Sequence, residues 1–122
     1  MPRTMPLLFT LLITATMTLE AHARLESSDP ANASTVMIAP ARVTLVFSES
    51  ARLTSIAIQG PHAASSQRLV VHLAEDQVRH VVPLPKLAPG DYVLTWRALS
   101  DDSHVTSGTV KFSVRSDSLT RK

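Results

Sequence analysis

The chain has 122 residues, no cysteine, and a formal net charge of +2 from 12 basic and 10 acidic side chains. Without cysteine there can be no disulfide, no thiolate metal site and no cysteine nucleophile, so a packed core must stabilise the fold. The basic residues are dispersed and not interleaved with aromatic residues, which gives nucleic-acid binding little support. The length allows one small domain.

The N-terminal segment has the pattern of an export signal. Arg3 supplies a positive charge, and residues 7–19 are apolar apart from threonines. This apolar run is shorter than the ~20 residues of a comfortable membrane-spanning helix, and small residues follow it, as in a secretory signal peptide. We therefore expect an exported mature protein.

Two cleavage points are open. The small-x-small pattern of Ala21-His22-Ala23 makes Arg24 the first mature residue, and on the pattern alone this choice is slightly favoured. A cut after Ala21 leaves His22 at the N-terminus instead. An N-terminal histidine offers its α-amine and its imidazole together, which suits a divalent metal such as Cu(II).

Short strand patterns recur between turn residues along the rest of the chain. After a turn at 27–30, alternating apolar residues predict strands at 43–47, 53–58, 69–73, 78–82, 92–98 and 110–114, with 69–73 and 78–82 forming a hairpin. No stretch after the leader has a helical period. About seven short strands predict an all-β domain, a Greek-key β-sandwich or barrel of the Ig-like (cupredoxin-like) kind, over residues 22–115, with 116–122 as a polar tail.

Two aromatic residues, Tyr92 and Trp96, are expected to stabilise this sandwich in different ways. The run Leu-x-Pro-Gly-x-Tyr that ends at Tyr92 has the pattern of a tyrosine corner, in which the hydroxyl ties a strand to the preceding connection. Trp96 lies on the same face of its strand as Tyr92, so we expect it in the core.

The five histidines divide into two groups. His72 and His80 lie within predicted strands and are expected to be sheet-face residues, while His62 lies in a loop without an obvious partner. His22 and His104 are the candidates for chemistry. The first stands at a possible mature N-terminus, and the second lies in a polar loop between the last two strands.

Asp102 and His104 are two residues apart in that loop, where a carboxylate and an imidazole can converge on one metal ion. The alternative is an Asx-type turn, in which Asp101 or Asp102 accepts backbone N–H groups. Glu49, just after the 43–47 strand, fits a solvated strand end. The residue types alone leave the metal site and the plain surface loop both open.

Five blocks follow one another along the chain: Ala-His-Ala-Arg-Leu at 21–25, Ser-Ser-Asp-Pro-Ala at 27–31, Leu-Val-Phe-Ser-Glu at 45–49, Leu-Ala-Pro-Gly-Asp-Tyr at 87–92, and Trp-Arg-Ala-Leu-Ser-Asp-Asp-Ser-His at 96–104. In order and spacing they resemble the CopC family of periplasmic copper-binding proteins. The resemblance covers the whole mature chain. It implies a β-sandwich that binds Cu(II) through an N-terminal histidine and an Asp-x-His loop.

Carried over residue by residue, the resemblance implies a ligand set for one Cu(II) per chain. The ligands are the amine and imidazole of His22, the carboxylate of Asp102 and the imidazole of His104, so the signal peptide would be residues 1–21. Glu49 matches the acidic residue of the family's Phe-Ser-Glu block and takes a secondary place beside the metal. Nitrogen-rich coordination without thiolates suits Cu(II). The Met-rich Cu(I) loop of some members has no counterpart, because the matching segment 60–66 lacks methionine.

The function implied by the resemblance is copper homeostasis or resistance. We expect a periplasmic, monomeric, non-enzymatic protein that buffers copper or delivers it to an inner-membrane transporter of the CopD type. Two alternatives remain open. A histidine-brace copper monooxygenase also uses an N-terminal histidine with a second histidine, and a metal-free Ig-like interaction module is expected if processing removes His22.

Overall fold

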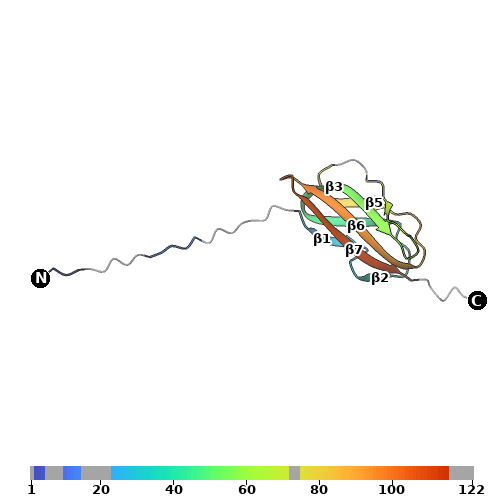
Figure 1. Cartoon of the computed structure of the whole chain (residues 1–122), viewed down its shortest axis with the longest axis horizontal. Helices are drawn as coiled ribbons and strands as arrows, with labels where there is room; N and C mark the ends of the chain where they lie inside the picture. The colour runs from blue at the N-terminus through green and yellow to red at the C-terminus, as the bar shows by residue number, and fades with distance from the viewer. Residues whose placement is uncertain (1, 5–9, 15–22, 72–74, 116–122) are drawn as a thin grey trace, which may run out of the picture.

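The computed structural model describes residues 2–4, 10–14, 23–71 and 75–115. Seven strands make up its ordered architecture (Figure 1): β1 (Leu25–Asp29), β2 (Ser34–Val36), β3 (Arg42–Gln59), β4 (Gln67–Arg68), β5 (Gln77–Pro83), β6 (Gly90–Ser100) and β7 (Val105–Val114). The predicted all-β class is confirmed. Within the described ranges, no helix has the length and apolar character needed to cross a membrane.

The strands form one curled sheet in the order β1-β3-β6-β7-β2, with β4 and β5 also paired to β3. The curl depends on β3, the longest strand. Its first part pairs with β1 and β5, and its second part pairs with β6 and β4. The β3–β5 register shifts between Val46 and Ala51. We call residues 47–50, where β3 changes partners, the β3 corner.

The core lies inside this curl and is filled by alternate residues of β3, β6 and β7. The buried face of β6 carries Tyr92, Leu94, Trp96 and Ala98, as the alternation predicts. The rings of Trp96 and Phe47 meet edge to face, with centroids 5.1 Å apart. The hydroxyl of Tyr92 donates to the carbonyl oxygen of Ala88 at 2.5 Å, so the predicted tyrosine corner is confirmed.

Three local predictions differ from the structure, and each difference comes from pairing with β3. The predicted turn at 27–30 is largely strand, because Ser27 and Ser28 pair with β3. The strands predicted at 43–47 and 53–58 are two parts of β3 itself. Of the predicted 69–73/78–82 hairpin, the second strand is present as β5, but residues 69–71 form no strand and β5 pairs with β3. Residues 72–74 lie outside the described part.

Gly108 allows the close packing of β7 against the core. It lies opposite Trp96, and a Cβ at this position would come within 2.7 Å of the indole Cζ2.

We expect Gly108→Ala to lower the free energy of unfolding by about 1–3 kcal/mol through overpacking, measured by urea denaturation. The exposed neighbour offers a control: Ser107→Ala should change stability by less than about 0.5 kcal/mol. Wild-type stability in Gly108→Ala would contradict the close contact with Trp96.

Candidate metal-binding site

The β6–β7 hairpin ends in a short loop that carries two of the predicted ligands, Asp102 and His104. Two backbone bonds close the loop: Ser103 donates to the carbonyl oxygen of Ser100, and Ser100 donates to that of His104, each at 3.0 Å. Between the two candidate residues, Ser103 has a φ of 66°, in the left-handed region. Such a tight reversal keeps the two candidate side chains close to one another.

The side chains of Asp102 and His104 contact each other directly. Nδ1 of His104 lies 2.9 Å from Oδ2 of Asp102, and the side chains are 64% and 31% exposed, respectively. The backbone N–H of His104 also donates to Oδ1 of Asp102 at 3.2 Å. The Asx-type turn considered from the sequence is therefore present. It does not exclude a metal site, because the same contacts orient an accessible imidazole.

Ser100, which the residue pattern did not single out, supports this pair from the core side. Its hydroxyl donates to Oδ1 of Asp102 and also lies 3.0 Å from the carbonyl oxygen of His104, while the residue is only 3% exposed. The signal was available in the alternation of β6. Continuing the buried series from Trp96 and Ala98 by two residues places Ser100 on the inner face, directly below the loop.

These contacts lower the pKa of the Asp102 carboxyl from 3.8 to about 2. The largest cause is the hydrogen bond from the Ser100 hydroxyl. Partial desolvation raises the pKa, and the backbone N–H and imidazole of His104 lower it further. Asp102 is therefore a carboxylate throughout the physiological pH range.

We expect Ser100→Ala to raise the pKa of Asp102 from about 2 toward 3.8, because the largest lowering contact is lost. A carbon-13 NMR titration of the metal-free protein measures this shift. Since the folded-state pKa is the lower one, the stabilising contribution of Asp102 is present above pH 3.8 and is lost as the pH falls toward about 2. Wild-type stability should therefore decline over that window.

A matched control removes another serine–aspartate bond. Ser113 donates to Oδ1 of Asp91 at 2.6 Å, at the opposite end of β6 from the loop. Ser113→Ala should leave the pKa of Asp102 unchanged. An unaltered pKa in Ser100→Ala would show that the serine hydroxyl does not hold the carboxylate.

The other predicted site residue that the structure describes is not joined to this pair. Glu49 lies exposed on the β3 corner. Among the described residues, no group of three or more His, Cys, Asp or Glu side chains is arranged to hold a metal ion. His22 lies outside the described residues, as does His72. His62 is exposed in the loop after Gly60, near Tyr92 and hence at the other end of the sandwich.

The start of the domain lies at the same end of the sandwich as the Asp102–His104 pair. The backbone N–H of Arg24 donates to Oγ of Ser48 at 2.9 Å, and the N–H of Ser48 donates to the carbonyl oxygen of Arg24 at 2.7 Å. Just beyond the β3 corner, Ala51 is the cross-strand partner of Ser100. The β3 corner thus connects the beginning of the domain with the base of the hairpin loop.

A cleft provides a second link between these two regions. Ala23 and Arg24 line it together with Trp96 of β6 and Thr106 of β7, which lies two residues beyond His104. Ala23 is fully buried and belongs to the hydrophobic core. The chain therefore enters the sandwich beside the hairpin that carries the Asp102–His104 pair.

The CopC domain model matches residues 25–115 of this chain. The chain belongs to the CopC family. Protein YobA of Escherichia coli K12 is 37% identical over 99 residues, which cover 78% of this chain and 80% of YobA. Copper resistance protein C of Pseudomonas syringae pv. tomato is 35% identical over 105 residues, covering 79% of this chain and 82% of that protein. The resemblance found in the sequence is confirmed, and with it the assignment to a family of copper resistance proteins.

Solved structures of CopC relatives share the fold. CopC from Methylosinus trichosporium OB3b aligns with a TM-score of 0.67 and 27% identity, covering 79% of this chain and 96% of that one. PcoC, a methionine-rich copper resistance protein from Escherichia coli, aligns with a TM-score of 0.60 and 31% identity, covering 78% of this chain and 100% of that one. These likenesses confirm the predicted β-sandwich type.

Proposed function

We propose that this CopC-family protein binds one Cu(II) per chain in the periplasm, at the end of the sandwich where the β6–β7 loop meets the start of the domain. It buffers copper or delivers it to an inner-membrane transporter of the CopD type, and acts as a monomer without enzymatic activity. The observation that carries the proposal is the contact between Asp102 and His104 on a loop tied through the β3 corner to Arg24.

The chemistry of the paired side chains supports copper binding. A neutral imidazole that donates from Nδ1 to a carboxylate has its lone pair on Nε2, the nitrogen with which that tautomer binds metals. His104 is oriented in this way by Asp102. Each carboxylate oxygen has two lone pairs, so Asp102 can accept its hydrogen bonds and also contact the ion. Its low pKa keeps it ionised for that role.

His22 completes the proposed ligand set with its amine and imidazole, and Glu49 takes a secondary place beside the metal. The burial of Ala23 supports a cut after Ala21. A cut after Ala23 would remove a fully buried member of the core, whereas the earlier cut retains it. Leu11, Leu12 and Ile13 are 76–81% exposed, which suits a segment that the mature protein does not keep.

Each of the two alternative functions makes a requirement that experiments can test. A histidine-brace monooxygenase needs a surface that presents its substrate to the metal, and the aromatic residues suited to a glycan are committed elsewhere. Trp96 and Tyr92 are only 4% and 7% exposed. A metal-free interaction module corresponds to a mature chain that starts at Arg24.

We expect His104→Ala to weaken Cu(II) binding more than about 100-fold, because it removes an imidazole ligand from a site of few ligands. Competition titration against a chelator of known affinity measures the loss, and circular dichroism should show the fold intact. His62→Ala, which removes an exposed histidine at the other end of the sandwich, should bind like the wild type. Equal affinities of His104→Ala and wild type would rule out this loop as the binding site.

The N-terminal part of the site makes a separate prediction. Native mass spectrometry of the protein exported by copper-supplemented cells should find a chain that begins at His22 and carries one copper ion. A recombinant chain with one alanine placed before His22 should bind Cu(II) at least about tenfold more weakly, because its amine is displaced from the chelate. A chain beginning at Arg24, or unchanged affinity in the extended chain, would contradict the N-terminal chelate.

A further inference from the structure

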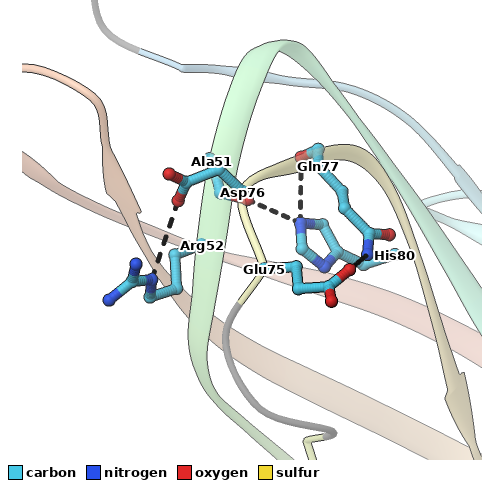
Figure 2. A network of polar contacts seen from close by, with 6 residues as sticks. All are labelled: Ala51, Arg52, Glu75, Asp76, Gln77 and His80. Atoms are coloured by element: carbon cyan, nitrogen blue, oxygen red, sulfur yellow. Dashed lines mark hydrogen bonds and ion pairs between the residues drawn. The ribbon is translucent and has the colours of Figure 1, made fainter.

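His80 lies half-buried on β5 and reaches across to β3 just beyond the corner (Figure 2). Its Nε2 is 2.8 Å from the carbonyl oxygen of Ala51 and 3.0 Å from that of Gln77. Carbonyl oxygens only accept hydrogen bonds, so Nε2 must carry a proton and donate to both. The expectation of a sheet-face histidine is confirmed, and its side chain also joins two strands.

The hydrogen bond occurs where the β3–β5 ladder is interrupted. Val46 pairs with Arg79 and Ala51 pairs with Gln77, so the four residues of the β3 corner face the single residue Val78. Such a bulge leaves backbone groups of the longer strand without ladder partners and allows the strand to bend. His80 adds a side-chain bond to β3 at Ala51, the residue at which the ladder with β5 resumes after the corner.

Packing holds the imidazole in this orientation. The ring of His80 meets Phe47 edge to face, with centroids 5.7 Å apart and planes at 80°. Phe47 in turn packs edge to face on Trp96 in the core. The imidazole is therefore anchored to the core by its ring and to β3 by its nitrogen, which restricts movement of the corner.

Two exposed polar contacts lie at the start of β5, next to the Gln77 carbonyl. The side-chain amide of Gln77 donates to Glu75 at 3.1 Å, and Arg52 on β3 forms an ion pair with Asp76 at 3.6 Å (Figure 2). These contacts are exposed, so each contributes little to stability. The part-buried hydrogen bond from His80 to the carbonyl oxygen of Ala51 is the stronger connection between β5 and β3.

We propose that His80 is a positioning residue for the Cu(II) site. It holds Ala51, and two connections to the site start at this bend in β3. Ser48 is bonded to Arg24, next to the start of the domain, and Ala51 is paired with Ser100, whose hydroxyl holds Asp102. By fixing the bend, His80 holds Arg24 and the Asp102–His104 loop in a constant relative position, on which the proposed Cu(II) site depends. The metal-binding consequence rests on the proposed function.

Two substitutions separate the hydrogen bond from the packing. His80→Phe keeps an aromatic ring against Phe47 but removes the donor, whereas His80→Gln keeps a donor without the ring. We expect His80→Phe to weaken Cu(II) binding about tenfold and to broaden the electron paramagnetic resonance spectrum of the bound Cu(II). His80→Gln should lose less affinity. His62→Phe, the same change in an exposed loop, should match the wild type.

Hydrogen exchange in the metal-free protein gives a readout that does not depend on copper. The amides of Ser48 and Ser100 should exchange at least about fivefold faster in His80→Phe than in wild type, because the bend opens more often. If wild type binds no Cu(II), the proposed function fails. Faster exchange in His80→Phe would still show that His80 holds the β3 corner. If wild type and His80→Phe bind Cu(II) equally, or exchange is unchanged, the positioning role is wrong. Should His80→Phe fail to fold, the same comparisons with His80→Gln decide the matter.

Discussion

The change of partners within β3 is the constraint on which the rest of this structure depends. Because one strand pairs first with β1 and β5 and then with β6, the sheet must curl and enclose its apolar face. Side chains add bonds at and beside the β3 corner: Oγ of Ser48 accepts from the backbone N–H of Arg24, and His80 donates to the carbonyl oxygen of Ala51.

The same end of the molecule carries the polar chemistry of the β6–β7 loop. Asp102 is at once the acceptor of an Asx-type turn, the partner of the His104 imidazole and the acceptor for a buried serine hydroxyl. These three interactions act together, since each fixes the carboxylate in the position the others need. Turn formation and metal binding are therefore compatible in this loop, because the turn orients the side chains that would contact the ion.

This chain differs from one CopC-family relative in its methionine content, and methionine content bears on which oxidation state of copper a protein favours. PcoC is described as methionine-rich. Here the loop 60–66 contains no methionine, and Met37 is the only methionine in residues 22–122. Soft thioether ligands favour Cu(I), whereas imidazole, amine and carboxylate groups favour Cu(II). This difference supports the proposed Cu(II) site at the hairpin end over a methionine-rich Cu(I) site.

The sequence by itself determined the all-β class, the buried face of β6, the tyrosine corner and the placement of Asp102 and His104 in one short loop, because each depends on residues close together in the chain. It did not reveal that β3 is one strand with a corner, that β5 pairs with β3, or that Ser100 and His80 support the site. Alternation shows which side of a strand is apolar but not which strand lies beside it. The partners of Ser48, Ala51 and His80 are chosen by contacts between distant segments, so only the tertiary structure decided how the start of the domain and the hairpin loop meet.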